Sequence, residues 1–464
     1  MAKEFRDDRG HLVMTKDMTN GSPMKLILGF SIPLLCGFLF QQFYTLADTM
    51  IVGRFLGMDE LAAVGATYSL NFMIIGFCMG TCSGFAIPIS HKFGAGDESG
   101  LRRYVANCVW LSAILTVVLT AATAALCRPV LVLMRTPENI LEDSYRYILI
   151  IFLGIPFAYL YNLLSAIIRA LGDSRTPVIF LVVSSFLNIA LDLVMIQCFH
   201  MGVEAAAWAT VISQGISGVC CLFFMLRRFE ILHVRKGEWN FDSHKIMVLC
   251  SMGIPMGLQY SVTAIGSVVL QSATNTLGST AVASVTAGNR IINFLSSPFD
   301  ALGATMATYG GQNVGAGKLE RVGTGLKSCV ILGCSYSVLA FIIVLFMGYP
   351  LAGLFVEGNQ TVILDNVKLY LILNTAFYVP LALVNIIRFL IQGMGFPPFA
   401  ILAGVFEMIA RALAGIVFVP LFGYTGACLG GPAAWILADA FLIPAYFHVK
   451  HKLEERSKSV MHGE

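Results

Sequence analysis

Residues 25–52 read KLILGFSIPLLCGFLFQQFYTLADTMIV, an apolar run whose polar side chains gather in its second half. A helix needs roughly 20 residues to cross the hydrocarbon core of a bilayer, so this segment is long enough to span it. Similar runs occupy residues 104–126, 145–168, 178–198 and 205–225. In lipid, every backbone polar group must be paired within its own segment, which predicts helices. We therefore expect an all-α membrane protein.

The composition of the whole chain supports this assignment. Of the 464 residues, 57% are hydrophobic and 12% are charged, whereas soluble domains carry roughly 25% charged residues. The alternating ten-residue segments typical of a membrane β-barrel are not evident. The charged opening of the chain does not resemble a signal peptide, so we expect residues 1–24 to form a solvated tail. A soluble enzyme is excluded by the same numbers.

The cysteines carry no sign of a metal site or a disulfide framework. The 12 cysteines are scattered along apolar segments, without a CxxC pair or a Cys/His cluster. We interpret them as small buried apolar side chains, and we expect no cofactor.

The apolar runs and the charges between them predict about twelve helices. Their expected ranges are 27–52, 60–86, 104–127, 144–168, 177–198, 203–226, 245–274, 280–307, 324–347, 363–388, 397–419 and 425–448. If the amino terminus is cytoplasmic, most of the 30 Lys and Arg residues fall in inner loops and tails, Arg388 among them. The outer loops would hold only Arg54, Arg128, Arg135 and Lys368. This bias predicts a multi-pass protein of the inner membrane with both termini in the cytoplasm. The basic residues are thus topology signals, and no nucleic-acid partner is expected.

The chain consists of two similar halves. Phe30–Pro33 (FSIP) matches Met252–Pro255 (MGIP), and Ile167–Arg169 (IIR) matches Ile386–Arg388 (IIR). Each half has an even number of expected crossings, so both insert the same way up, as in transporters with a central cleft between two bundles. The expected division is a tail (1–24), a six-helix bundle (25–228), a linker (229–243), a second six-helix bundle (244–448) and a tail (449–464). Rocking of one bundle against the other would give alternating access.

Two glycine-containing patterns have structural explanations. Residues 311–319 read GQNVGAGKL, which lacks the spacing and the Ser/Thr of a phosphate-binding loop, so a nucleotide-driven pump is not indicated. We expect a tight inner turn there. Gly76, Gly80 and Gly84 form a ridge of small residues that favours close helix packing.

Ionisable residues inside the predicted helices are the candidates for function. A carboxylate at the bilayer centre costs roughly 2.5–3.5 kcal/mol on insertion scales, so each one requires an explanation. On the first helix, Gln41, Tyr44 and Asp48 share one face. On the fifth helix, Asn188 and Asp192 are four residues apart and also share a face.

Other polar groups can complete this site, and its chemistry leaves two ions open. Thr210 on the sixth helix supplies a hydroxyl, and Asn162 on the fourth an amide. Two carboxylates in one dry cavity cannot both stay ionised cheaply, so one is expected to bind and release a proton. Alternatively, the oxygens of Asp48, Asn188, Asp192 and Thr210 would coordinate sodium. A purely structural role, with both acids hydrogen-bonded to neighbouring helices, is the competing interpretation.

The second half offers less of this chemistry. The seventh helix carries Gln259 at a place where an acid would match the first half. Glu407 and Arg411 are spaced i, i+4, and we expect them to neutralise each other. Arg290 and Asp300 are ten residues apart on the eighth helix, too far for one turn, and Asp439 has no assigned role.

Several motifs together resemble one transporter family. They are Leu46–Arg54 (LADTMIVGR), Leu61–Gly65 (LAAVG), Gly94–Gly96 (GAG), Ile168–Asp173 (IRALGD) and Gly311–Gly317 (GQNVGAG). The combination is similar to the multidrug and toxic compound extrusion (MATE) transporters, from Lys25 to Lys450. The resemblance implies secondary antiport, in which entry of protons or sodium drives export of organic cations and other drugs.

Within that family, the first half resembles the prokaryotic DinF-like branch. The resemblance implies a cation-coupling site of Tyr44, Asp48, Asn188, Asp192 and Thr210. Gln41, Asn162 and Gln259 are the candidate substrate-binding residues. The NorM-like branch places an acid on the seventh helix, where this chain has Gln259, so the resemblance does not extend to a second coupling site.

The sequence thus predicts a multidrug antiporter whose partners are small organic molecules and membrane lipid, and we expect a monomer. One alternative is a flippase for a lipid-linked oligosaccharide or peptidoglycan precursor. A pyrophosphate-bearing substrate favours several basic residues in the cavity, but only Arg290 and Arg411 lie well within the expected helices. A second alternative, an intramembrane enzyme, lacks a histidine within a helix beside suitable partners.

Overall fold

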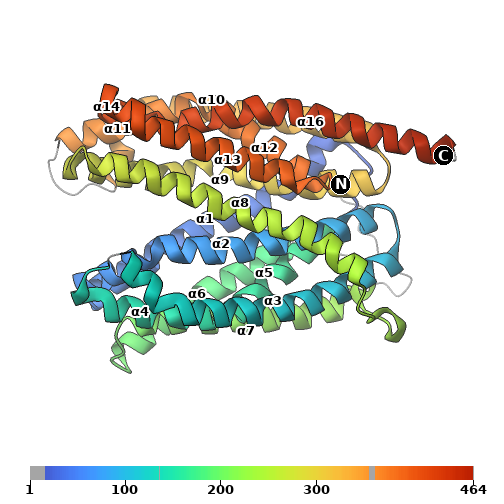
Figure 1. Ribbon diagram of the computed structural model, residues 1–464, viewed down its shortest axis with the longest axis horizontal. Coiled ribbons are helices and arrows are strands. Elements are labelled where there is room, and N and C mark those ends of the chain that lie inside the picture. Colours follow the sequence, from blue (N-terminus) through green and yellow to red (C-terminus); the bar gives the residue numbers. More distant parts are fainter. Residues whose placement is uncertain (1–15, 135, 355–360, 463–464) are drawn as a thin grey trace. The chain divides into compact units, whose positions relative to one another are not determined.

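The computed structural model describes residues 16–134, 136–354 and 361–462, and Figure 1 follows the order of the helices. Four basic residues used to predict the topology, Lys3, Arg6, Arg9 and Arg135, lie outside these ranges.

The first half of the described chain is helical except for short turns. Its helices are α1 (Pro23–Phe55), α2 (Met58–Gly94), α3 (Glu98–Leu133), α4 (Glu138–Leu153), α5 (Ile155–Ala170), α6 (Arg175–Gln197) and α7 (Glu204–Arg228). Two short 3-10 turns, Glu230–Leu232 and Lys236–Glu238, lie in the expected linker.

The second half repeats this series. Its helices are α8 (Ser243–Asn275), α9 (Ser279–Gly315), α10 (Leu319–Gly353), α11 (Thr361–Ala376), α12 (Tyr378–Gly393), α13 (Pro397–Leu413), α14 (Val419–Phe422), α15 (Tyr424–Cys428) and α16 (Gly430–His462). A π-helical turn, Ala414–Phe418, joins α13 to α14.

The lengths and compositions of these helices confirm an all-α membrane protein. In the described residues, 9 helices are long and apolar enough to cross a membrane, or up to 11 if each of two bent pairs is counted as one span. Helix α9 is 37 residues long, but its Gly, Ser, Thr and Asn residues lower its apolar character. It occupies the place of the expected eighth helix.

Two expected helices, 144–168 and 363–388, are in fact broken. The first bends by 47° between α4 and α5, at Gly154, and the second by 52° between α11 and α12, at Phe377. Each break is followed by a proline, Pro156 or Pro380, which has no N–H to bond to the preceding turn. Gly154 also lies against Val211, whose side chain leaves no room for a Cβ. In each half, the hydrogen bond that this proline cannot make weakens the helix within three residues of the break.

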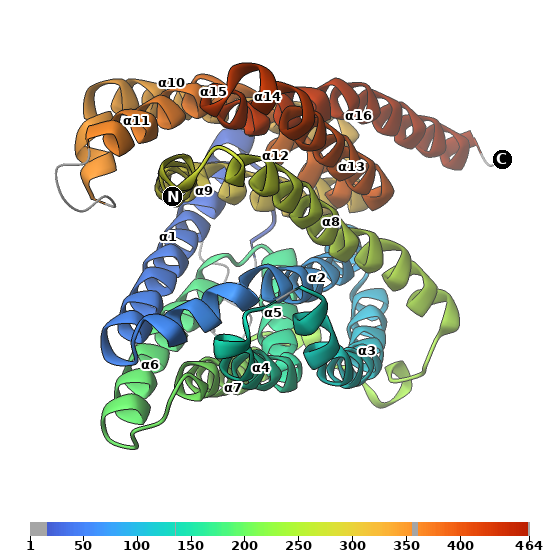
Figure 2. The ribbon, with the colours of Figure 1, turned by 60° about the vertical axis from the view of Figure 1, so that its left-hand side comes forward.

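The chain forms two compact units. Unit 1 contains Cys36–Gly257 together with Lys16 and Asp17, and unit 2 contains Met18–Leu35 and the residues from Leu258 onward. Helices α1 and α8 are therefore each divided between the units. Within unit 1, α5 lies against α2 and α7, and α6 packs on α7 (Figure 2). Within unit 2, α9 lies against α10, α11 and α12, and α16 packs on α13.

Glycines bring α2 and the first part of α8 into backbone contact within unit 1. A Cβ on Gly80 would lie 2.4 Å from the carbonyl oxygen of Met256, and a Cβ on Gly84 would lie 2.5 Å from the Cα of Gly253. No side chain fits at either position, which confirms the packing role expected for Gly80 and Gly84.

The expectation that the cysteines are buried is wrong for three of them. Cys36, Cys198 and Cys220 are exposed. Each lies on or at the end of a membrane-spanning helix, where an apolar thiol can face lipid without cost.

Candidate functional site

The second part of α1, which belongs to unit 1, carries Gln41, Tyr44 and Asp48 on one face. The threonines that follow Tyr44 and Asp48 in the sequence do not compete for this site. The hydroxyl of Thr45 donates to the backbone oxygen of Gln41 at 2.9 Å, and that of Thr49 donates to the backbone oxygen of Thr45 at 2.8 Å. The helix thus satisfies its own hydroxyls, and the side chains of Tyr44 and Asp48 are left for partners elsewhere.

Thr210 joins three helices of unit 1. Asn188 on α6 donates through Nδ2 to the Thr210 hydroxyl at 3.2 Å, and the Tyr44 hydroxyl lies 3.5 Å from the same oxygen. Thr210 itself donates to the backbone oxygen of Ala206 on α7 at 2.9 Å. The structure therefore brings together Tyr44, Asn188 and Thr210 in one hydrogen-bonded group.

The two carboxyl groups lie beside this group and interact with each other. Asp192 is fully buried, and Asn188 is 1% exposed. Asp48 and Asp192 lie within electrostatic range of each other, without a hydrogen bond between their side chains. Such a bond would require a proton, because two ionised carboxylates offer only acceptors.

Four buried oxygens of this cluster have no donor. They are Oδ1 of Asp48, both carboxyl oxygens of Asp192 and Oδ1 of Asn188. In the part of the chain that the structure describes, neither aspartate forms an ion pair with a Lys or Arg. A buried charge without a partner is costly. The arrangement therefore offers a binding site for a proton or for a hard cation that prefers oxygen ligands.

One neighbour of this cluster was missed by the sequence analysis. Tyr147 on α4 is buried and lies within electrostatic range of Asp48, Tyr44 and Asp192. It belongs to the apolar run 145–168, whose length predicts a membrane helix but does not show which of its faces meet other helices. Its hydroxyl is the feature of the sequence that could have identified it, because a tyrosine hydroxyl inside a membrane helix usually has a polar partner on a neighbouring helix.

The three candidate substrate residues are not gathered into one group. The side-chain amide of Asn162 donates to the backbone oxygen of Ala158 on its own helix at 2.8 Å. Gln41 shares the face of Asp48 but forms no side-chain hydrogen bond with any described residue. Gln259 lies in unit 2, where its oxygen accepts from Nε2 of Gln392 at 2.6 Å.

The expected pair of Glu407 and Arg411 exists, but it is part of a larger cluster in unit 2. Oε2 of Glu407 lies 3.4 Å from Nη2 of Arg411, while its Oε1 pairs with Nη2 of Arg388. Arg388 also interacts electrostatically with Asp439 and Asp300. Oδ1 of Asp439 is buried without a hydrogen-bond partner.

This cluster corrects two expectations from the sequence. Arg388 was assigned to an inner loop as a topology signal, but it is buried inside α12. Glu407 does not simply neutralise Arg411, because it faces two guanidinium groups. The spacing within one helix revealed the nearer partner, whereas the partner on α12 depends on helix packing.

Comparison with known proteins places the chain in a family. A family model described as MatE matches residues 33–194 and 255–421. The "Probable multidrug resistance protein YpnP" of Bacillus subtilis (strain 168) is 31% identical over 310 residues, which cover 66% of this chain and 68% of that protein. The "FAD transporter" of Shewanella oneidensis is 25% identical over 376 residues, which cover 78% of this chain and 80% of that protein.

Solved structures show the same fold. One described as the "Outward-facing conformation of a multidrug resistance MATE family transporter of the MOP superfamily" matches with a TM-score of 0.88 at 22% identity, covering 94% of this chain and 98% of that one. The family model covers most of both halves, in agreement with the resemblance of the motifs. The chain belongs to the MatE family of multi-pass membrane transporters.

Proposed function

We propose that this protein is a multidrug antiporter that exports organic, often cationic, compounds from the cytoplasm in exchange for protons or sodium. It would lie in the inner membrane with both termini in the cytoplasm, as the distribution of Lys and Arg favours. The names of relatives such as YpnP support drugs as substrates. The observation that carries the coupling is the group of four buried oxygens without donors around Asp48 and Asp192.

Ion binding at this group would change the balance of charge inside unit 1. A proton shared between Asp48 and Asp192 would supply the missing donor and remove one negative charge. Sodium would instead take its ligands from Asp48, Asn188, Asp192 and the hydroxyl of Thr210. In either case, the ion favours the conformation in which these oxygens are closest together.

Exchange follows if drug and ion favour different conformations. A ligand shifts a conformational equilibrium only through its different affinity for the two states. By linkage, an ion that weakens drug binding is itself weakened by the drug to the same extent. Asp48 and Asp192 would hold the ion, whereas Tyr44, Asn188 and Thr210 would connect the site to α1, α6 and α7. Gln41, Asn162 and Gln259 remain the candidates for contact with the drug.

A second candidate function is export of a pyrophosphate-bearing anion. Arg388 and Arg411 both pair with Glu407. Two guanidinium groups therefore share one bonded carboxylate. Such groups suit phosphate oxygens. The relative named FAD transporter favours this alternative. Asp439 and Asp300, which also interact with Arg388, oppose it.

The test is transport by purified protein in liposomes, with a pH gradient or a sodium gradient imposed separately. We expect one gradient to drive movement of a fluorescent cationic dye, and Asp48→Asn to abolish that movement. The matched control is Asp59→Asn, the same exchange at an exposed position of unit 1. Full dye transport by Asp48→Asn would overturn the site. Flavin nucleotide movement without dye movement would establish the second candidate instead.

A further inference from the structure

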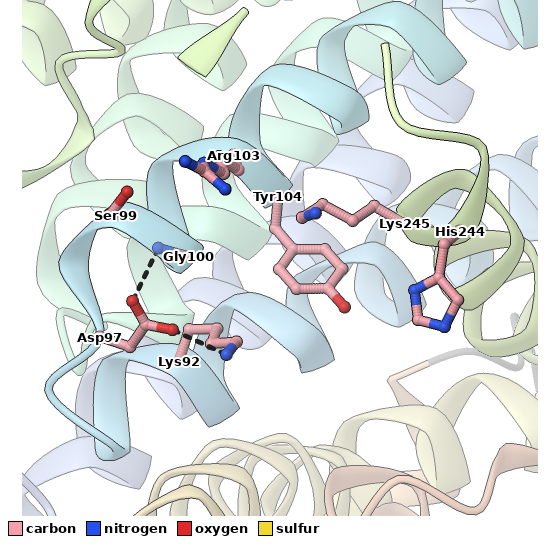
Figure 3. A pocket seen from close by; sticks show the side chains of 8 residues that line it. All are labelled: Lys92, Asp97, Ser99, Gly100, Arg103, Tyr104, His244 and Lys245. Carbon is pink, nitrogen blue, oxygen red and sulfur yellow. Dashed lines mark hydrogen bonds and ion pairs between the residues drawn. The ribbon is translucent and has the colours of Figure 1, made fainter. Parts of the chain in front are cut away.

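A separate cavity of about 330 Å³ lies in unit 1, where α2 ends and where α3 and α8 begin. Its lining is shown in Figure 3 and consists of Lys92, Asp97, Ser99, Gly100, Arg103, Tyr104, His244 and Lys245. A second cavity of about 360 Å³ shares Arg103 and Lys245 and extends along the linker to Phe241. The two cavities therefore meet at Arg103 and Lys245. Neither of these residues is near Asp48 or Asp192 in the sequence.

The linker holds this region in shape. Glu238 accepts from Nε of Arg102 at 2.8 Å, from the hydroxyl of Ser99 at 3.1 Å and from the backbone N–H of Arg235 at 2.9 Å. The hydrogen bond from Arg102 is the main reason that the pKa of Glu238 falls from 4.5 to about 2. Oδ1 of Asn107 on α3 accepts from the backbone N–H of Asp242 at 2.9 Å. The cavity is thus formed by fixed elements.

The charges around the cavity favour an anion. Lys92 pairs with Asp97 at 2.7 Å, and Lys245 pairs with Asp242. Within the described ranges, the side chain of Arg103 forms no hydrogen bond or ion pair. The same holds for the imidazole of His244 and the hydroxyl of Tyr104, which stand around the open space with Lys245 in Figure 3. The guanidinium of Arg103 lies within electrostatic range of Asp97 but forms no direct pair, so its N–H groups remain for a ligand, with a hydroxyl and further basic groups within the same hollow. Guanidinium groups match the oxygens of a phosphate.

Exposed apolar side chains border the charged groups. Trp110 is 46% exposed, Trp239 43% and Phe241 58%. The indole N–H of Trp110 donates to the backbone oxygen of Trp239 at 3.3 Å, which fixes the two tryptophans together. Trp110 lies two turns after Arg103 on the same face of α3. Trp110 lies about three turns into α3 and Trp239 lies in the linker before α8, and tryptophans are enriched at the membrane–water interface.

We propose that this site binds the phosphate of an anionic phospholipid headgroup, with the acyl chains along Phe241 and Trp110. A phosphate diester would meet Arg103 and Lys245, and Tyr104 and His244 would donate to its oxygens. The lipid would bridge α3 and the start of α8 through Arg103 and Lys245. This role is independent of which ion or drug the protein transports.

The test is native mass spectrometry of the purified protein with phosphatidylglycerol or phosphatidylcholine of the same acyl chains. We expect tighter binding of phosphatidylglycerol, and Arg103→Gln should weaken it about fivefold, the usual contribution of one basic side chain near an anionic membrane. Arg228→Gln, an exposed arginine at the end of α7, is the matched control and should bind as the wild type does. Equal binding of the two lipids, or equal behaviour of the two variants, would overturn the proposal.

A second comparison separates the lipid from free phosphate. Phe241→Ser removes an apolar contact without changing the charge, so it should weaken phosphatidylglycerol binding and leave any competition by inorganic phosphate unchanged. If Phe241→Ser binds the lipid as the wild type does, and inorganic phosphate competes at the same concentration as the lipid, the ligand is soluble phosphate and the lipid assignment fails.

Discussion

Replacement of Asp192 by Asn should reduce transport without reducing the stability of the protein. Asp192 is fully buried, and neither of its carboxyl oxygens has a donor among the described residues. Removing a buried hydrogen-bonded acid normally leaves its donors unsatisfied, at a cost of about 1–3 kcal/mol. Here no donor is abandoned. The substitution instead removes a charge whose burial costs roughly 2.5–3.5 kcal/mol at the bilayer centre.

The new amide also has to be buried, at a cost of about 1–3 kcal/mol in proteins. The two contributions nearly cancel, so Asp192→Asn should keep the free energy of unfolding at, or about 1–2 kcal/mol above, that of the wild type. Export should fall at least about tenfold, because a 1.4 kcal/mol loss of ion-coupling free energy already has that effect. If Asp192 had a purely structural role, Asp192→Asn would lose stability and keep its export activity.

Two measurements check this prediction. Unfolding of the detergent-purified proteins gives the stability, and ethidium efflux from cells that lack their own pumps gives the activity, with Asp59→Asn as the control for both. A loss of more than about 2 kcal/mol in stability would mean that donors to Asp192 exist after all. Wild-type efflux by the variant would refute its role in coupling.

Two further predictions concern stability alone. Glu238→Gln should lower the free energy of unfolding by about 1–2 kcal/mol at neutral pH, since it weakens the pair with Arg102. The pKa of Glu238 is lowered to about 2, so the difference in the free energy of unfolding between wild type and variant should be constant above about pH 5. It should shrink as the pH falls from 4.5 toward 2. A difference that grows in acid would contradict this prediction. Gly84→Ala should destabilise by about 1–3 kcal/mol, since its Cβ would meet the backbone of Gly253 at 2.5 Å, whereas Gly65→Ala on the same helix has open space and should be nearly neutral. Equal melting of these two variants in detergent would show that α2 and α8 can separate freely.

The membrane spans could be predicted from the sequence because length and apolar character alone define them. The sequence-based ranges do not include the breaks within two of these spans, although a proline lies near each break. Pro156 and Pro380 lie in long apolar runs, and a proline inside such a run can either bend the helix or be absorbed by it. The close packing of Gly154 against Val211, which the sequence does not show, accompanies the first of these bends.

The candidate site was predictable to the extent that it follows helix periodicity. The spacing of Tyr44 and Asp48, and of Asn188 and Asp192, defines two faces, and the structure brings these faces together. Contacts between helices are not contained in that spacing. For this reason the sequence did not reveal Tyr147 beside the carboxylates.

The same limit explains the second half. Arg388 resembled a loop residue because a basic side chain near the end of an apolar run usually marks the membrane surface. Its partner, Glu407, lies on another helix, and the pairing depends on how α12 packs against α13. An i, i+4 spacing identifies only partners on the same helix.

The glycine contacts of α8 lie on either side of a proline, Pro255. Up to Gly257 this helix is fastened to α2 by contacts that leave no room for a methyl group, and from Leu258 it belongs to unit 2. Pro255, which removes one helical hydrogen bond, lies two residues before the end of the unit 1 part at Gly257. Helix α1 has the same construction, with Pro33 two residues before its own division at Leu35. In both helices, therefore, a proline that removes one backbone hydrogen bond lies within three residues of the point where the helix passes from one compact unit to the other.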